Sequence, residues 1–408
     1  MSEKNSMHPG LMASENRQAN ASKPVSAVIK PGATIGILGG GQLGRMLTLA
    51  ATPLGYRCVT LDPTPDSPCG QIARQVTAAY DDVGAARELA GSCDVVTYEF
   101  ENVDAGVAAL LEQESYVPQG SKLLYTTQHR LREKRAIEAA GVPVAPYREV
   151  TSAGSMQQAV EELGLPCVLK TVMGGYDGKG QRVIRHLEEV QAAYEELNTA
   201  GVGLVLESFV PFQCEISVVA ARSTKGEVRT FPPAENIHVN NILHASIVPA
   251  RVSEELQARA EQLAAQLIEG LDAVGLLAVE MFVTKDGEIY VNELAPRPHN
   301  SGHYTIDACA TSQFEQHIRA ICGLPLADPR LLTPVVMVNI LGEHMEEVLE
   351  LLTSTASQTA TEKVIPKLHL YGKSESKNGR KMGHVNLLCQ DTEAAMQWIE
   401  QTNIWRNR

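Results

Sequence analysis

The strongest indication of the fold is the segment Gly174-Gly175-Tyr176-Asp177-Gly178-Lys179-Gly180-Gln181. It follows Cys167-Val168-Leu169-Lys170, an apolar run with the composition of a buried strand that ends in a lysine. Four glycines leave backbone N–H groups that anionic oxygens can approach closely, and Lys179 adds a positive charge. No Gly-Lys-Ser/Thr follows, as a Walker A loop would require. The segment therefore predicts a loop that closes over a triphosphate, with a plain surface loop as the alternative.

The pattern of apolar residues and breakers around this loop predicts a chain of mixed α/β and α+β regions. We expect strands at 34–38, 58–62, 94–99, 167–170, 204–207, 215–219, 276–283, 288–293 and 335–340, and helices at 45–54, 128–141, 154–163, 187–198 and 254–270, the last capped by Ser253. The first strands and helix form a βαβ unit with a parallel sheet. The expected parts are a flexible leader (1–30), an α/β domain (31–128), a linker helix with a small α+β lid (129–210), a larger mixed domain (211–334) and a small C-terminal β-rich domain (335–408).

Composition limits the classes of ligand and the compartment. A formal net charge of −13 over 408 residues repels a phosphate backbone, so we expect small-molecule ligands and no nucleic acid. The eight cysteines form no CxxC pair, which favours a reduced cytoplasm and indicates no zinc site. No run approaches the roughly 20 apolar residues of a membrane-spanning helix, and residues 1–30 lack the apolar core of a signal peptide. We expect a cytoplasmic protein without membrane contact.

A second glycine-rich segment, Gly39-Gly40-Gly41-Gln42-Leu43-Gly44, lies between the first predicted strand and helix. With Asp62 at the end of the next strand, it matches the dinucleotide fingerprint of nicotinamide enzymes. Any tight strand-to-helix turn also needs glycines, and helix N-termini attract many phosphates and carboxylates. A nicotinamide cofactor, another ligand and a purely structural turn all stay open.

Glu280 and Glu293 lie on two predicted strands joined near Asp286-Gly287. If Asp286 and Gly287 form a two-residue turn, Glu280 pairs directly with Glu293. Opposed like charges destabilise a ladder, so two glutamates on otherwise apolar strands indicate a compensating cation. Carboxylates on a rigid platform suit Mg²⁺, whose other ligands would be water and ATP phosphates. Solvated strand ends are the alternative, and a longer turn would break the register.

The loop after the second of these strands reads Pro296-Arg297-Pro298-His299-Asn300-Ser301-Gly302-His303. Its prolines present Arg297, His299 and Asn300 in an extended conformation that suits capture of a small oxyanion. A structural loop is the alternative.

A basic patch in this acidic chain is formed by Lys373, Arg380 and Lys381, beside a predicted hairpin around Asn378-Gly379. On local evidence alone, a solvated charged surface is the simpler interpretation.

Together these segments resemble the 5-(carboxyamino)imidazole ribonucleotide synthases, or N5-CAIR synthetases, which are ATP-grasp enzymes of purine biosynthesis. The resemblance covers about residues 33–390 and rests on the motifs at 39–46, 174–181, 292–303 and 379–384. The last two separate this family from other ATP-grasp enzymes. The resemblance implies an ATP-grasp fold with an N-terminal Rossmann-like (pre-ATP-grasp) domain, a small lid domain and a small β-rich C-terminal domain.

The resemblance also implies a reaction, in which ATP and bicarbonate carboxylate 5-aminoimidazole ribonucleotide through carboxyphosphate. ATP would contact Arg130, Lys170, Gly175, Tyr176, Asp177, Gly178, Lys179, Gly180, Gln181, Glu207, Ser208, Phe209, Val210, Glu215, His238, Asn292 and Glu293. Mg²⁺ would be held by Glu280 and Glu293. Catalytic roles would fall to Tyr176, Arg297, His299 and Asn300, and the ribonucleotide would meet Gln42, Glu99, Glu101, Lys373 and Arg380.

A homodimer is expected from the resemblance alone. Two other classes stay open: a nicotinamide oxidoreductase that uses Gly39–Gly44 and Asp62, and a non-catalytic subunit that binds ATP without turnover. Among ligases, formate-dependent glycinamide ribonucleotide transformylase is the nearest competitor, and the basic tail motif argues against it.

Overall fold

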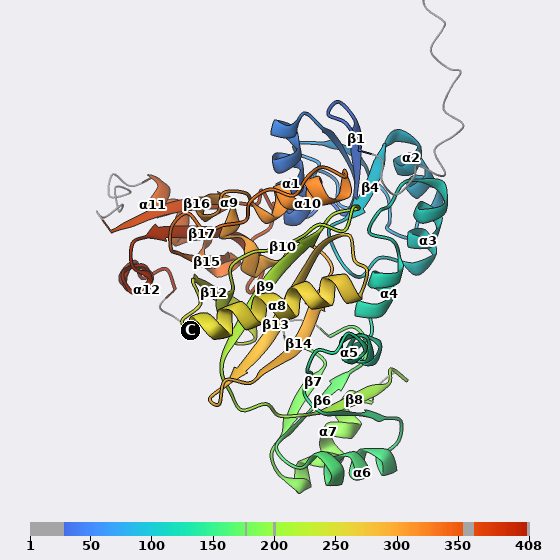
Figure 1. The fold of residues 1–408 in the computed structure, drawn as a ribbon, viewed down its shortest axis with the longest axis vertical. Helices are drawn as coiled ribbons and strands as arrows, with labels where there is room; N and C mark the ends of the chain where they lie inside the picture. Colours follow the sequence, from blue (N-terminus) through green and yellow to red (C-terminus); the bar gives the residue numbers. More distant parts are fainter. Residues whose placement is uncertain (1–27, 176–177, 199–200, 354–362, 406–408) are drawn as a thin grey trace, which may run out of the picture.

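The computed structural model describes residues 28–175, 178–198, 201–353 and 363–405. Residues 1–27 of the predicted leader lie outside this part, as do Tyr176, Asp177 and almost all of a Ser/Thr-rich segment at 353–361. Three β-sheets are arranged along the long axis of the molecule, with the N-terminal sheet at one end and the small sheet at the other (Figure 1). None of the described helices is long and apolar enough to cross a membrane.

The N-terminal region is built on a parallel sheet with the strand order β3-β2-β1-β4, which confirms the predicted α/β unit. Its elements are β1 (Thr34–Leu38), α1 (Gln42–Ala51), η1 (Thr52–Leu54), β2 (Arg57–Leu61), β3 (Arg74–Val76), α2 (Val83–Ser92), β4 (Val95–Tyr98), α3 (Ala105–Glu114) and α4 (Lys122–Thr127). Helices α2 and α3 cover one face of the sheet, and α1 covers the other together with α10 (Gln313–Ile321) from the central region. Because α1 begins directly after Gly41, the N–H groups of the glycine turn are also those of the first helical turn.

The small sheet, at the bottom of Figure 1, is the predicted lid. Its strand order is β5-β8-β6-β7, all antiparallel, and α6 and α7 pack on one face of it. The elements are α5 (Arg130–Ala139), which leads into it, β5 (Tyr147–Val150), α6 (Ala153–Leu163), β6 (Cys167–Thr171), β7 (Gln181–Ile184), η2 (Leu187–Glu189), α7 (Val190–Leu197) and β8 (Leu204–Ser208). The glycine-rich segment joins β6 to β7, so its ends are fixed by two paired strands.

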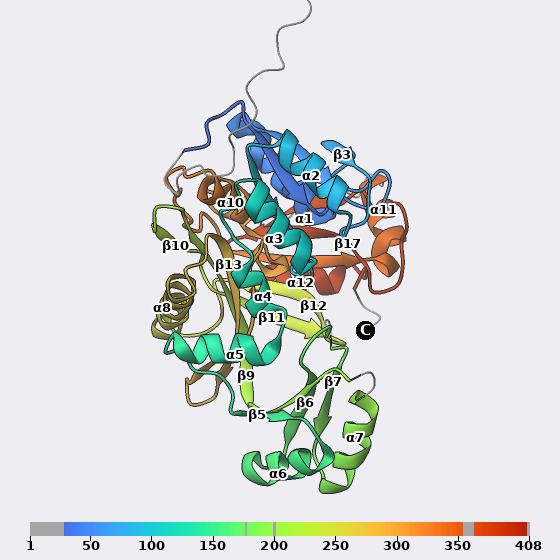
Figure 2. The same ribbon diagram turned by 90° about the vertical axis from the view of Figure 1, so that its right-hand side faces the viewer.

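The central sheet has nine strands in the order β14-β13-β9-β11-β12-β15-β17-β16, with β10 paired to β9. Helices α8 and α10 pack on opposite faces of β9 and β13, and α12 covers the other end of the sheet (Figures 1 and 2). The elements are β9 (Phe212–Arg222), β10 (Val228–Thr230), β11 (Ala234–Val239), β12 (Ile242–Val248), α8 (Glu254–Gly270), β13 (Gly275–Thr284), β14 (Ile289–Ala295), η3 (Asn300–Gly302), α9 (Thr305–Ala308), α10, β15 (Val335–Leu341), η4 (Gly342–His344), α11 (Met345–Thr353), β16 (Val364–Leu370), β17 (Lys381–Cys389) and α12 (Thr392–Gln401). Because β12 pairs with β15, the segment after residue 335 extends this sheet. The predicted domain limits stay predictions.

The β13–β14 hairpin confirms the predicted pairing of Glu280 with Glu293 but not the predicted turn. Thr284 N donates to Glu288 O at 2.9 Å, so the loop is longer than the dipeptide Asp286-Gly287. The longer loop shifts the register, and a bulge between Glu280 and Met281 shifts it back. The two-residue turn was therefore wrong, and the pairing is correct because two irregularities cancel.

Candidate active site

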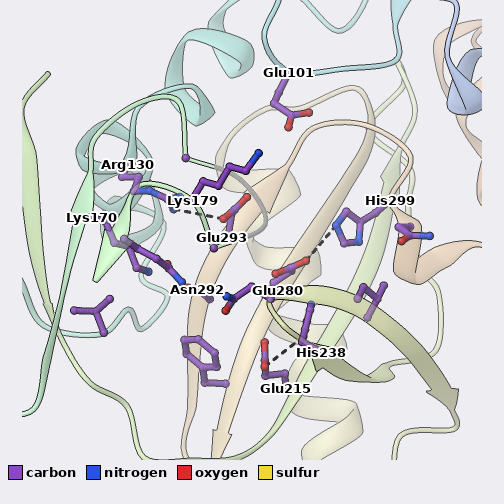
Figure 3. Close-up of a pocket in the computed structure, with 18 of the residues that line it drawn as sticks. Glu101, Arg130, Lys170, Lys179, Glu215, His238, Glu280, Asn292, Glu293 and His299 are labelled. Carbon is purple, nitrogen blue, oxygen red and sulfur yellow. Dashed lines mark hydrogen bonds and ion pairs between the residues drawn. The ribbon is translucent and has the colours of Figure 1, made fainter. Parts of the chain in front are cut away.

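A cleft of ≈ 630 Å³ opens where the three sheets meet, and most predicted site residues line it (Figure 3). They are Gln42, Glu99, Glu101, Arg130, Lys170, Gly175, Gly178, Lys179, Gln181, Glu207, Ser208, Phe209, Val210, Glu215, His238, Glu280, Asn292, Glu293, Arg297, His299 and Asn300. The lining does not include Gly180, Lys373 or Arg380, and the predicted residues Tyr176 and Asp177 lie outside the described part of the chain. Segments from both ends of the sequence thus converge on one cavity.

The lid wall of the cleft carries an excess of positive charge. Lys170 Nζ lies 3.0 Å from Glu207 Oε2, and Lys134 Nζ lies 3.2 Å from Glu207 Oε1, with all three side chains buried. Burial lowers the pKa of Lys170, which Glu207 opposes. Burial would raise the pKa of Glu207, but the two lysines bring it below its usual value. Two cations share one carboxylate, so this wall favours an anionic ligand.

The floor of the cleft carries the Glu280/Glu293 pair. His299 Nε2 lies 3.1 Å from Glu280 Oε1, and Arg130 Nη1 lies 3.4 Å from Glu293 Oε2 (Figure 3). Burial would raise the pKa of Glu280, but the hydrogen bond and charge of His299 lower it to about 2. Within the described ranges, no group of three or more His, Cys, Asp or Glu side chains could hold a metal ion by itself. A cation here would need further oxygen ligands from a substrate or water.

One end of the cleft is an apolar slot. Its wall is formed by Ala145, Val168, Val183, Phe209, Val210, Phe212 and Phe282. The rings of Phe212 and Phe282 are stacked, with centroids 4.7 Å apart. Beside them, His238 Nδ1 lies 3.3 Å from Glu215 Oε1 (Figure 3). Burial would lower the pKa of His238, but Glu215 raises it. An apolar slot with a polar pair at its edge suits a flat heterocycle with a hydroxylated ring attached.

The opposite end presents the Arg297 loop. Glu101, predicted to face a substrate, accepts hydrogen bonds from Arg297 through both carboxylate oxygens, one of them at 2.9 Å from Nη2. His299 Nδ1 lies 2.8 Å from Ser301 Oγ, and Asn300 exchanges two amide hydrogen bonds, at 3.0 and 2.7 Å, with Asn339 on β15. These contacts fix the orientation of the loop's side chains without any ligand.

The first glycine turn is filled by carboxylates of the protein itself. Gly41 N and Gly44 N each donate to one oxygen of the buried Glu99. Gly40 N donates to Asp62 Oδ2 at 2.8 Å, which Tyr80 also bonds. Burial raises the pKa of Glu99 to about 7, against the effect of its two N–H donors. A dinucleotide would need these donors and Asp62 for its pyrophosphate and ribose, so this geometry argues against the nicotinamide interpretation.

The basic tail lies beside the cleft. Strands β16 and β17 form a hairpin, but they are joined by the loop 371–380 and not directly by Asn378-Gly379. Within that loop Arg380 N donates to Lys377 O at 3.0 Å, across the turn that contains Gly379. Lys373 Nζ donates to Lys381 O at 2.6 Å. Burial, followed by the charge of Arg380, lowers the pKa of Lys373 to about 8, and the charge of Glu99 acts in the opposite direction. The basic patch thus lies close enough to the N-terminal region for the charge of Glu99 to affect the pKa of Lys373.

Several cleft residues were absent from the predicted set. They include Leu43, Phe100, Asn241, Leu243 and Phe282. Asn241 follows Asn240, and both have positive φ, so this dipeptide signalled a β11–β12 turn but not its place beside the lid. Phe282 and Leu243 are ordinary strand residues, and no local pattern distinguishes a cleft wall from a core.

A nucleotide-sized cleft between a glycine-loop lid and a sheet with paired carboxylates defines an ATP-grasp enzyme, and family models agree. An ATP-grasp domain model matches residues 135–314, a ribonucleotide synthetase preATP-grasp domain model matches 32–128, and a phosphoribosylaminoimidazole carboxylase C-terminal domain model matches 335–397. The N5-carboxyaminoimidazole ribonucleotide synthase of Bacillus subtilis is 52% identical over 386 residues, which are 93% of this chain and 97% of the relative. The chain belongs to the N5-carboxyaminoimidazole ribonucleotide synthase family, a family of ligases.

Solved structures of relatives have the same fold. An ADP complex of an N5-carboxyaminoimidazole ribonucleotide synthetase is 55% identical, with a TM-score of 0.88 over 93% of this chain and 98% of the relative. The Aspergillus clavatus enzyme in complex with ADP and 5-aminoimidazole ribonucleotide is 31% identical, with a TM-score of 0.83 over 93% of this chain and 98% of the relative. The implied ATP-grasp fold is confirmed.

Proposed function

We propose that this protein carboxylates 5-aminoimidazole ribonucleotide with bicarbonate and ATP, and forms N5-carboxyaminoimidazole ribonucleotide, ADP and phosphate. The observation that carries the proposal is one cleft in which a cationic lid wall, two paired glutamates and an anchored arginine loop face each other. Family membership supports it, and so do the two ligands of the Aspergillus clavatus structure. The product would enter purine biosynthesis.

ATP is assigned to the lid side of the cleft. Adenine lies in the apolar slot along Glu207, Ser208, Phe209 and Val210, and the ribose meets Glu215 and His238. The phosphates run past Arg130, Lys170, Asn292 and Glu293 under the described loop residues Gly175, Gly178, Lys179, Gly180 and Gln181. The buried Lys170 meets phosphate with little competing water, which strengthens its electrostatic effect.

Glu280 and Glu293 are assigned to Mg²⁺. They pair across adjacent strands and both line the cleft, so the residues present fit the ion. Two carboxylates leave room for phosphate and water ligands, which Mg²⁺ prefers. When bound, the ion would neutralise charge on the phosphate oxygens.

The chemistry needs two displacements. A bicarbonate oxygen attacks the γ-phosphorus, the bond to the β–γ bridging oxygen breaks, and ADP leaves with the electron pair. The exocyclic amine of the ribonucleotide then attacks the carboxyphosphate carbon, phosphate leaves, and the amine gives up a proton. Arg297, His299 and Asn300 hold the bicarbonate and its phosphorylated form, and their fixed hydrogen bonds reduce the cost of orienting it.

The ribonucleotide is assigned to the opposite side. Gln42, Glu99 and Glu101 face it from the N-terminal region, and Lys373 and Arg380 bind its 5′-phosphate. The role of Tyr176 beside the amine rests on the family resemblance alone. A homodimer is our further proposal, which sedimentation equilibrium of the purified chain can test. We also propose a cytoplasmic location, which cell fractionation can test.

The test is incorporation of labelled carbon. ADP release should require the aminoimidazole ribonucleotide, bicarbonate and Mg²⁺, and the ribonucleotide product should carry label from bicarbonate. Glu293→Gln should abolish turnover, whereas Glu288→Gln, a matched change on the exposed side of the same hairpin, should not. ADP release without labelled product, from folded protein, would refute the proposed reaction.

A further inference from the structure

Helix α5 lies between the lid and the central sheet (Figure 1), and side chains of its polar face bond to β8 of the lid and to β14 at the edge of the central sheet. Arg130, Glu133 and Lys134 share one helical face because they are spaced by three and four residues. Arg130 reaches Glu293, and Lys134 reaches Glu207 of the lid sheet. Glu133, only 2% exposed, accepts a hydrogen bond from the backbone N–H of Leu294 at 2.8 Å. None of the roles proposed above uses Glu133.

The bond to Leu294 explains how an irregular strand is held. β14 lies at the edge of the sheet, where outward N–H groups need partners. In a regular edge strand every second N–H points outward. Val291 N donates outward to Pro143 O at 2.9 Å, so the next outward N–H should be that of Glu293. In the bulge, Asn292 has no partner on β13. The next outward N–H is therefore that of Leu294 and not that of Glu293.

The same bulge changes what the strand presents to the cleft. Successive side chains of a regular strand point to opposite faces. Asn292 and Glu293 are successive, yet both line the cleft, and the bulge between them and β13 permits this.

We propose that Glu133 is a positioning residue that fixes the β14 bulge and so keeps Asn292 and Glu293 on the nucleotide. Without an acceptor the Leu294 N–H would be buried and unpaired, and a one-residue shift of the strand would relieve this but turn a cleft side chain away. This inference rests on the proposed function in one respect, that Glu293 meets the metal and phosphates.

Three variants test the inference. Glu133→Ala removes the acceptor, Glu133→Gln keeps an acceptor oxygen, and Glu138→Ala removes an exposed carboxylate of the same helix that accepts one hydrogen bond from Tyr147. ADP release is measured against Mg²⁺ and ribonucleotide concentration, and hydrogen exchange is measured on the peptide that contains β14. Should Glu133→Ala fail to fold, Glu133→Asp, which draws the carboxylate back by one carbon, takes its place.

Loss of the acceptor should lower kcat and raise the Mg²⁺ requirement, each on the order of 10-fold as for other partners of metal ligands, and should speed exchange in β14. KM for the ribonucleotide should stay within about twofold, and Glu133→Gln should behave as wild type. If Glu133→Ala matches Glu138→Ala in Mg²⁺ requirement and exchange, the inference is wrong. Normal turnover of Glu293→Gln would instead refute the proposed metal site, and hydrogen exchange alone would then decide the role of Glu133.

Discussion

The two glycine-rich loops of this protein have similar composition, and each follows a strand, but they use their backbones differently. In the loop at 39–44, the N–H groups of Gly41 and Gly44 are bonded to Glu99. In the loop at 174–181, the described residues Gly175, Gly178 and Lys179 line the cleft beside Lys170, whereas Gly41, Gln42 and Leu43 of the first loop line it beside Glu99. Glycine spacing therefore indicates that an acceptor group approaches the backbone N–H groups closely. It does not say whether that is a ligand or a carboxylate of the protein.

The charges around each loop make the distinction. Asp62 and Glu99 lie against the first loop, so a phosphate there would be repelled. The buried Lys170, with Lys134 behind it, lies beside the second and attracts a phosphate. Asp62 and Glu99 follow strands β2 and β4, which come after the first loop in the sequence, and this is why that loop could not be assigned from its own pattern. Lys170, by contrast, lies on β6, the strand directly before the second loop.

Replacing Lys170 should have the largest effect, because it removes the charge that distinguishes the second loop. Lys170→Met keeps most of the side-chain volume, and Glu207 keeps Lys134 as its partner. Loss of a charge at the phosphates should lower kcat/KM for ATP by on the order of 10²–10³. Steady-state ADP release at varied ATP measures this.

The control is Arg182→Met, an exposed cation of the same lid sheet that pairs with Glu196. It should keep the wild-type kcat/KM. Equal losses in the two variants would mean that general lid charge, rather than the position of Lys170, attracts ATP.

Replacing Glu99, which bonds the first loop, should instead lower the free energy of unfolding. In Glu99→Gln an NH₂ group replaces one of two acceptor oxygens and faces a backbone N–H. Leaving a buried donor unpaired should lower the free energy of unfolding by about 1–3 kcal/mol. Denaturant unfolding below the pKa of about 7 measures the change, because above that pH ionisation of the buried carboxylate itself lowers the stability of the wild type. Glu114→Gln, in an exposed ion pair with Arg87, should cost under about 1 kcal/mol. A fully stable Glu99→Gln protein would contradict the assigned role of Glu99.

Substitutions at two glycines of the second loop distinguish the effect of backbone strain from that of a steric contact. Gly174 and Gly178 have nearly equal φ, +77° and +78°, but a Cβ on Gly174 meets nothing within 4 Å, whereas one on Gly178 would lie 2.4 Å from Asn241 Nδ2. Both alanine variants should be strained by about 1–2 kcal/mol. Gly178→Ala should lose roughly 10-fold more kcat/KM for ATP, since its loop must move away from the β11–β12 turn. Asn241→Gly in the same chain, which also removes the Asn241 Cβ that would lie 2.6 Å away, should restore part of that loss. No restoration would show that the contact is irrelevant.

Local sequence patterns predicted the elements of this fold well, because caps, glycines and apolar periodicity are local. Ser253 caps α8 as expected, through a bond from Leu256 N. The Glu280/Glu293 pairing was predicted correctly by an argument with the wrong turn, since no local signal announces the bulge at Asn292. The partners Glu101–Arg297 and Asn300–Asn339 depend on packing between distant segments, so the sequence could name these residues as candidates but not find their bonds.

The smallest predicted effect is the influence of Glu99, beside the first loop, on the pKa of Lys373. Lys373 has a pKa of about 8 because burial and Arg380 lower it, while Glu99 raises it. The protonated amine, which would bind the 5′-phosphate, is present below that pH and lost above it. kcat/KM for the ribonucleotide should therefore fall as pH rises through about 8, as the free enzyme titrates. Lys373→Arg should abolish this fall, because arginine stays charged. Glu99→Gln removes a charge that raises the pKa, so the fall should move to lower pH. A profile unchanged in Lys373→Arg would assign the titration, and the phosphate contact, to another group.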